Sequence, residues 1–369
     1  MVHSSNNSEK SPEIDSIFQR AEKLRERSCY PQSLKLFREA LRKYKKVRDT
    51  IGALNCALAL GDIYRMIGNF DLAIKNYTHS IELAKSMHNP VTVSDAKVGL
   101  ALSLRAQGKW KDTIKLIREA RKTYLKNNDK QGTAFALWAE AGALRIKGDI
   151  IKAIKRFKES YTEFKSLKDP QGIGYSLCGL GGTSRIAGLF KDSKNYYKNA
   201  NKLFSEQKDT FGKAYSFCGI GNAYRMLNDF KYALRNFTKA AKLYEKIGDK
   251  VSYSYTLWGI GMTYSLMGNY KKAHDYFIHS MKLFQKTKDP RGMIYCRLGL
   301  GQLSLIDGSN ALAKKYIESS LTESMNNGFR VESCHAKILL SFLNSKKDVR
   351  CYNRLGLKLR FQGLPLNIP

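Results

Sequence analysis

Residues 214–227 read AYSFCGIGNAYRML, and residues 230–247 read FKYALRNFTKAAKLYEKI. In both segments the apolar and small residues recur every three or four positions, which is the spacing of one face of an α-helix. Asn228 and Asp229 separate the segments, a pair that favours a left-handed turn followed by the start of a new helix. The stretch therefore predicts a hairpin of two helices.

The same pattern recurs every 40 residues along the chain. The small residues at the centre of the first helix form a column: Gly61, Ala101, Ala141, Gly181, Gly221, Gly261 and Gly301. A fixed period of this kind indicates a solenoid, in which each unit buries its apolar face against its neighbours. We expect a disordered head at residues 1–13, eight units over 14–333, a capping helix at 334–344 and a basic, apolar tail at 345–369. The tail could pair as a strand, cover the last unit or stay flexible.

The order of small and aromatic positions resembles that of the tetratricopeptide repeat (TPR) family. One unit shows it in Gly221, Tyr224, Asn228, Ala233, Phe237 and Ala240. The 40-residue length looks most like the Pins-type spindle adaptors and the kinesin light chains. The resemblance implies an all-α fold, a right-handed α-solenoid of about eight helix-turn-helix repeats, whose first helices line a concave groove and bind extended peptides.

On the concave face the sequence places a column of arginines and columns of aromatic residues. The candidate ligand-binding residues are Arg25, Arg65, Arg105, Arg145, Arg185, Arg225, Tyr175, Tyr215, Tyr255, Tyr295, Trp138 and Trp258. Guanidinium groups in register, ~10 Å apart as packed helices are, would suit carboxylates or phosphates. The arginines could instead pair with carboxylates of neighbouring units, and the tyrosines could pack between units. Glu140, at a position that is apolar in other units, could pair with a nearby arginine or contact a ligand, and we favour the ion pair.

The charge of the chain is strongly positive. Its 369 residues include 64 Lys and Arg against 32 Asp and Glu, which gives a net charge of +32. A small domain needs only ~2–8 charges for solubility, so the excess should attract polyanions. Exposed positions of the second helices supply a basic column at Lys35, Lys75, Lys115, Lys155, Arg235 and Lys315. The sequence thus allows nucleic-acid binding as an alternative function.

Catalytic and metal-binding patterns were sought and not found. The chain has no phosphate-binding loop, no nucleophile with a matched base and no histidine pair at metal-ligand spacing, so we expect no enzyme activity and no cofactor. The seven cysteines form no CxxC pair and are expected to be reduced, buried residues. No apolar run reaches the ~20 residues of a membrane span, so we expect a cytoplasmic protein without integral membrane association.

These observations favour a non-enzymatic scaffold or adaptor. Its groove would bind an extended, acidic segment of another protein. RNA or single-stranded DNA on the basic surface is the alternative partner, and self-association through the end units is possible.

Overall fold

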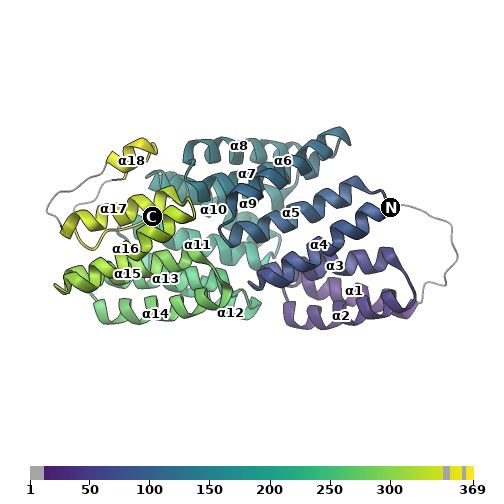
Figure 1. Cartoon of the computed structure of the whole chain (residues 1–369), viewed down its shortest axis with the longest axis horizontal. Helices are drawn as coiled ribbons and strands as arrows, with labels where there is room; N and C mark the ends of the chain where they lie inside the picture. The colour runs from purple at the N-terminus through teal and green to yellow at the C-terminus, as the bar shows by residue number, and fades with distance from the viewer. Residues whose placement is uncertain (1–11, 344–349, 360–362) are drawn as a thin grey trace.

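The computed structural model describes residues 12–343, 350–359 and 363–369, and within them the only regular secondary structure is α-helix. Sixteen of the helices form eight consecutive hairpins, followed by α17 and the short α18 (Figure 1). Most of the predicted head, residues 1–11, lies outside the described residues, and α1 begins at Pro12.

The helices of the eight hairpins are nearly equal in length. Their bounds are α1 Pro12–Glu26 with α2 Tyr30–Lys46, α3 Thr50–Met66 with α4 Phe70–Ser86, α5 Pro90–Ala106 with α6 Trp110–Lys126, α7 Lys130–Lys147 with α8 Ile150–Ser166, α9 Pro170–Ile186 with α10 Phe190–Glu206, α11 Thr210–Met226 with α12 Phe230–Ile247, α13 Lys250–Leu266 with α14 Tyr270–Thr287, and α15 Pro290–Ile306 with α16 Asn310–Asn326. The next helix, α17 (Arg330–Leu343), begins before the predicted residue 334, and α18 spans Arg350–Arg354.

Each of the helices α1 to α16 is followed by one residue with left-handed backbone geometry. Positive φ angles recur every 20 residues, from Ser28 at 58° to Gly328 at 68°. Asn228, which the sequence marks as a turn, has φ 61°. A single left-handed residue lets the chain stop one helix and satisfy its last carbonyls before the next helix begins. This constant spacing produces the 40-residue period.

Many first helices start with an Asp-x-x-Gly pattern. The carboxylate of Asp129 accepts a hydrogen bond from the backbone N–H of Gly132 at 2.7 Å. A Cβ atom at Gly132 would lie 2.5 Å from the ring of Tyr124 in the preceding helix. The aspartate therefore caps the helix, and the glycine lets the previous aromatic ring pack against its first turn.

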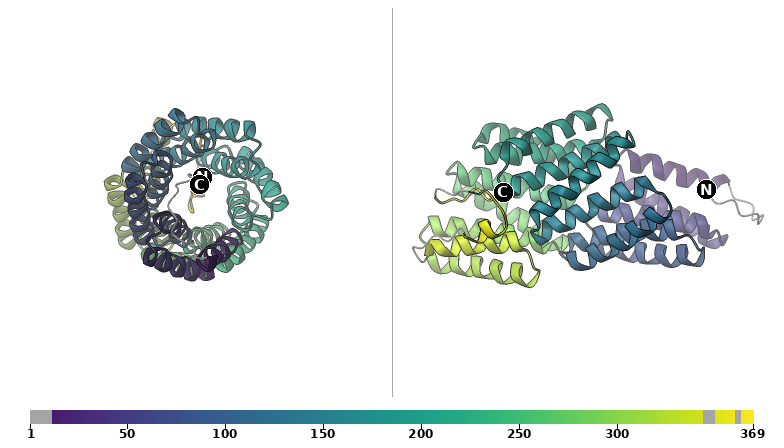
Figure 2. Two further views of the ribbon diagram at one scale, coloured as in Figure 1. Left: turned by 90° about the vertical axis from the view of Figure 1, so that its right-hand side faces the viewer. Right: turned by 90° about the horizontal axis from the view of Figure 1, so that it is seen from above.

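The hairpins wind into a right-handed superhelix. Seen along the axis from the α1 end, the helices form a ring in which the chain runs clockwise as it recedes (Figure 2, left). Successive first helices pack on one another, α3 on α5, α5 on α7 and α9 on α11, which places them on the inner wall. The predicted all-α, right-handed solenoid is confirmed.

The superhelix completes more than one turn, and its turns touch. Lys288 forms an ion pair with Asp71 at 2.7 Å, and Arg330 forms one with Asp149, also at 2.7 Å. The indole N–H of Trp110 donates to the carbonyl of Asn327 at 2.8 Å. We call these contacts the inter-turn seam. Because the seam joins residues 181 to 217 positions apart, the inner groove is closed into a channel.

One expectation about the cysteines is wrong. Cys334 on α17 and Cys351 on α18 form a disulfide, with their Cα atoms 5.6 Å apart, whereas Cys29, Cys56, Cys178, Cys218 and Cys296 are free. Cys351 follows the repeats and has no place in their register, so the 40-residue pattern could not show that α18 folds back on α17. The disulfide ties α18 to α17, the helix that follows the eighth unit.

Candidate ligand-binding channel

The inner wall of the superhelix encloses two adjoining hollows. The first has a volume of ≈ 570 Å³ and is lined by helices of the first turn of the superhelix. The second has a volume of ≈ 340 Å³ and lies further along the superhelix axis. Arg65, Trp138 and Tyr175 line both. Of the twelve candidate residues, all except Arg225 line one or both hollows. The structure thus brings the predicted set together, and its role in binding remains a prediction.

The first two arginines are neutralised within their own helices. Arg25 forms an ion pair with Glu22 at 2.6 Å, and Arg65 forms one with Asp62 at 3.4 Å. Burial alone would lower the pKa of Arg65, but the phenol of Tyr77 and the charge of Asp62 outweigh it and the pKa is raised. Four aspartates line this first hollow: Asp62, Asp95, Asp129 and Asp169. This end of the channel therefore carries both charges.

The next three arginines have no such compensation. Within the part of the chain that the structure describes, no carboxylate forms an ion pair with Arg105, Arg145 or Arg185, and the Nε and Nη1 atoms of Arg185 are buried without a hydrogen-bond partner. Burial, followed by the nearby charge of Arg145, lowers the pKa of Arg105 to about 10. Burial likewise lowers the pKa of Arg185. Guanidinium groups stay charged at neutral pH, so these three arginines give the second hollow positive charge that no acidic side chain of the described residues pairs with.

Glycines of the following unit make room for these side chains. A Cβ atom at Gly142 would overlap the guanidinium of Arg105, and one at Gly182 would lie 2.7 Å from Nη1 of Arg145. The guanidinium of Arg105 also lies over the ring of Trp138, 5.5 Å from the ring centroid. An aromatic face attracts a cation without removing its charge. The sequence showed these glycines only as variation within a column, so their function was missed.

The aromatic candidates connect one unit to the next. Tyr175 donates a hydrogen bond from its hydroxyl to Asp209 at 3.0 Å, and the indole N–H of Trp138 donates to the carbonyl of Tyr175 at 3.2 Å. Trp258 repeats the second contact on the carbonyl of Tyr295 at 3.1 Å. Packing between units, one of the two roles that the sequence allows, is therefore present; Tyr215 and Tyr255 line the second hollow.

Arg225 is the one candidate that the channel does not expose. Its side chain is fully buried and contacts Asn222, Asn367 and the carbonyl of Ile368. Burial and the charge of Arg185 lower the pKa of Arg225 to about 9. The tail therefore occupies the place where this arginine would otherwise face the channel.

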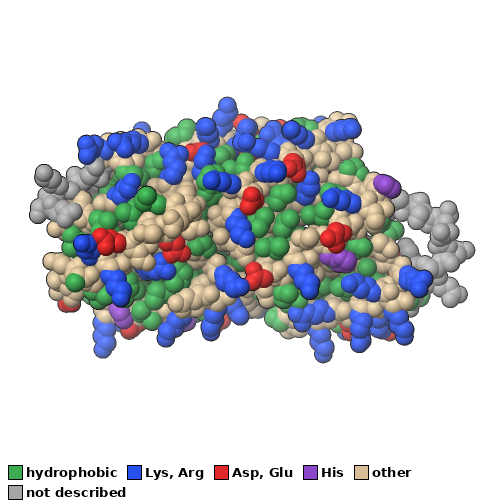
Figure 3. Space-filling model, in the orientation of Figure 1, with side chains coloured by type: hydrophobic (Ala, Val, Ile, Leu, Met, Phe, Trp, Pro, Cys, Tyr) green, Lys and Arg blue, Asp and Glu red, His purple; other side chains and the backbone are tan. Residues whose placement is uncertain are grey.

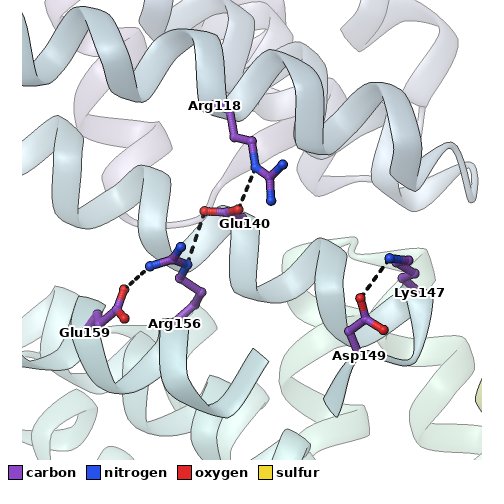
Figure 4. Close-up of polar contacts among 6 residues, drawn as sticks. All are labelled: Arg118, Glu140, Lys147, Asp149, Arg156 and Glu159. Carbon is purple, nitrogen blue, oxygen red and sulfur yellow. Dashed lines mark hydrogen bonds and ion pairs between the residues drawn. The ribbon is translucent and has the colours of Figure 1, made fainter. Parts of the chain in front are cut away.

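Glu140 has the structural role that was expected. Its carboxylate is almost fully buried on α7, where it pairs with Arg118 of α6 at 2.9 Å and with Arg156 of α8 at 3.5 Å (Figure 4). Arg156 also pairs with Glu159 at 2.5 Å. Glu140 does not line either hollow. It joins three successive helices instead.

The described residues contain no group of three or more His, Cys, Asp or Glu side chains arranged to hold a metal ion. Among them, no helix combines the length and apolar character that crossing a membrane requires.

Consecutive helix hairpins that enclose a lined channel define the class of α-solenoid repeat proteins. The tetratricopeptide repeat model matches residues 13–86, which comprise the first two hairpins, and the remaining hairpins repeat their architecture. The first two hairpins are therefore similar to tetratricopeptide repeats, and the later hairpins share their fold. The chain's narrower resemblance to Pins-type proteins and kinesin light chains stays a prediction.

Three solved structures share the fold. A Rap protein complexed with competence and sporulation factor is 13% identical, with a TM-score of 0.60 over 93% of this chain and 98% of that one. The Rap conjugation gene regulator of plasmid pLS20, complexed with the Phr* peptide, is 11% identical, with a TM-score of 0.65 over 86% and 96%. Aspartyl phosphate phosphatase F from Bacillus subtilis is 12% identical, with a TM-score of 0.56 over 88% and 96%. No curated protein sequence is significantly similar to the chain. At these identities the likeness is one of fold.

Proposed function

We propose that the chain is a non-enzymatic binding scaffold that holds an extended, acidic segment of another protein inside its channel. The observation that carries the proposal is the cluster of Arg105, Arg145 and Arg185, three cations that line the second hollow and have no carboxylate partner among the described residues. Two proteins of similar fold were solved with a bound peptide or factor, which supports this kind of ligand.

Buried guanidinium groups without a counter-ion favour the binding of an anionic ligand. A buried cation without a counter-ion is costly, and a carboxylate placed against it would recover that cost as binding energy. Arginine forks bind carboxylates through two parallel hydrogen bonds, so a segment with acidic residues spaced along an extended backbone could contact successive arginines. The paired Arg25 and Arg65 at the mouth offer no comparable gain. We therefore place the acidic part of the ligand in the second hollow.

The test compares two triple variants that remove the same charge. One is Arg105→Gln, Arg145→Gln and Arg185→Gln in the channel. The matched control is Lys115→Gln, Lys155→Gln and Arg235→Gln, all exposed on the second helices. The probe is a fluorescein-labelled, glutamate-rich dodecapeptide, and binding is followed by fluorescence anisotropy at 0.15 M salt, where long-range attraction is screened beyond ~8 Å.

We expect the channel variant to bind the probe at least ~10-fold more weakly, because the loss of a single charge-assisted hydrogen bond accounts for about that factor. The control should lose less than ~3-fold. Equal losses in both variants would mean that the probe responds to net charge, and the channel would be the wrong site. Circular dichroism on both variants checks that the helices are intact.

Nucleic-acid binding is the second candidate, favoured by the net charge of +32 and by the exposed basic column on the second helices. Lys and Arg side chains are spread over the outer face of the molecule (Figure 3). Binding at this surface predicts the opposite result for a labelled single-stranded dT20 probe: the control variant weakens it more than the channel variant, and log affinity falls steeply with log salt.

A further inference from the structure

Part of the tail lies inside the channel. In the view along the axis, the end marked C projects within the ring of helices (Figure 2, left). Leu366 and Ile368 are fully buried against the inner wall, and Pro369 lines the second hollow beside Arg145 and Arg185. Residues 363–369 read GLPLNIP and form no helix. A non-helical segment of the chain thus fills the inner end of its own candidate binding site.

The wall recognises this segment through its backbone and one side-chain amide. Arg225 donates one hydrogen bond to the side-chain oxygen of Asn367 and another to the carbonyl of Ile368, the latter at 2.9 Å. The amide nitrogen of Asn367 donates back to the carbonyl of Arg225 at 2.9 Å. The side-chain oxygen of Gln302 accepts the backbone N–H of Leu366. The backbone N–H of Ile368 also donates to the carbonyl of Leu366 at 2.9 Å, so these contacts select a tight turn with an asparagine at its centre.

The residues that make these contacts occupy the channel-lining columns of the repeat. Arg225 stands at the register of Arg105, Arg145 and Arg185, and Gln302 stands at the register of Gly142 and Gly182. The tail therefore uses ligand positions. Its upstream part is held separately, by the hydrogen bond from the N–H of Lys358 to the carbonyl of Ala187 at 3.0 Å and by the disulfide of Cys351. Release of residues 363–369 from the channel leaves those two attachments in place.

We propose that this end of the channel is a peptide-binding compartment for a segment without charged side chains that turns at an asparagine between two aliphatic residues. Residues 363–369 are its built-in occupant, and a partner segment of the same pattern displaces them. The compartment adjoins the hollow of the three unpaired arginines, which Pro369 also lines, but its hydrogen bonds come from Arg225 and Gln302 and do not require an acidic ligand. It therefore stands or falls separately from the proposed function.

The tether determines how the competition behaves. A short linker holds an attached ligand at an effective concentration of ~1 mM. If the free segment binds with a Kd of ~10 μM, the attached copy reduces its apparent affinity ~100-fold. The intact chain should therefore ignore a free peptide that the shortened chain binds.

The experiment uses a fluorescein-labelled peptide of sequence GLPLNIP and a chain from which residues 363–369 are deleted. We expect micromolar binding to the shortened chain and at least ~30-fold weaker binding to the intact one. A probe with alanine in place of asparagine should bind at least ~10-fold more weakly. In the shortened chain Arg225→Gln should abolish probe binding, whereas Arg235→Gln, an exposed position of α12, should leave it within ~2-fold.

A second variant covers the case in which the deletion unfolds the chain. Asn367→Ala in the intact protein keeps Leu366 and Ile368 and removes the amide contacts, so it should bind the probe more tightly than the unmodified chain does. The proposal is overturned if the shortened chain is folded by circular dichroism and does not bind the probe, or if the intact and shortened chains bind it equally. It is also overturned if the shortened chain unfolds and Asn367→Ala shows no gain.

Discussion

Replacing Glu140 tests whether its ion pairs stabilise the fold. Only 1% of its side chain is exposed, whereas its partners Arg118 and Arg156 are 61% and 33% exposed. Other units place Leu100, Leu180 or Ile220 at the corresponding position. Two substitutions are informative, Glu140→Leu, which follows the other units, and Glu140→Gln, which keeps the shape and removes the charge.

The structure determines the sign of each effect. A buried carboxylate loses several kcal/mol of hydration, and its two partly solvated partners return only about 1 kcal/mol each. Leucine avoids that cost and adds about 1.5–3 kcal/mol of apolar burial, while both arginines can turn to water. Glu140→Leu is therefore expected to raise the free energy of unfolding by about 1–3 kcal/mol. Glu140→Gln should lower it by about 1–2 kcal/mol, because a buried amide cannot serve two guanidinium donors.

Urea unfolding monitored by circular dichroism measures both effects. Hydrogen exchange over α6, α7 and α8 serves as a local readout, since repeats can unfold in parts. Glu159→Gln is the matched control: it removes a partly exposed partner of Arg156 and should change stability by less than about 1 kcal/mol. If Glu140→Leu destabilises the protein by 3 kcal/mol or more, the ion pairs outweigh the desolvation cost, and the reasoning about this site is refuted.

Three further predictions concern the helix ends and the inter-turn seam. Burial raises the pKa of Asp249, the cap of α13, to about 6. Between pH ~4 and ~6 the folded chain therefore keeps a proton that the unfolded chain has released, and the free energy of unfolding falls as pH rises through this range. Asp249→Asn should raise the melting midpoint at pH 7.5, by the equivalent of up to about 3 kcal/mol, and change it little at pH 4; equal shifts at both pH values would contradict this. Gly108→Ala and Gly268→Ala both place a Cβ atom on a left-handed residue, at φ 81° and 78°, but only the first brings it within 2.8 Å of Phe329 across the seam. Both should cost about 1 kcal/mol, and only Gly108→Ala should increase hydrogen exchange at the start of α17; the same exchange in both variants would count against the seam. Lys168 has φ 54°, so Lys168→Gly should stabilise the chain by about 0.5–1 kcal/mol in urea unfolding, and a loss would show that this turn is not strained.

The sequence predicted the features that depend on contacts between residues close together in the chain. The turn at Asn228 and the 40-residue columns depend on contacts within one unit or between neighbours, so their periodicity is visible in the residues themselves. The seam between Lys288 and Asp71 is different, because it depends on the pitch that small rotations accumulate over several units. No local pattern marks it. For the same reason the sequence could not show which residues close the channel.

The columns of the sequence predicted which residues would belong to the candidate site. They did not predict which of these residues would be paired, unpaired or covered. Equal spacing made Arg25 through Arg225 look alike, yet Arg25 is paired, Arg105 is unpaired and Arg225 is covered. The paired members could have been recognised from Glu22 and Asp62, three residues earlier on the same helix face. The contact of the tail with Arg225 could not, because residues 363–369 have no periodicity that relates them to the repeats.

The contrast between arginines outside the hollows and Arg105 inside them supports the proposed binding site. Where an arginine outside the hollows joins helices, the fold supplies an acid: Glu140 faces Arg118, and Glu323 faces Arg297. The guanidinium of Arg105 instead lies over the ring of Trp138 and in the space that a side chain at Gly142 would fill. This arrangement positions the guanidinium and leaves its charge available. Isolated positive charge lowers stability, so a wall built for stability alone would place acids here as it does elsewhere. The unpaired arginines therefore lower the stability of the ligand-free chain, and a bound carboxylate would restore it.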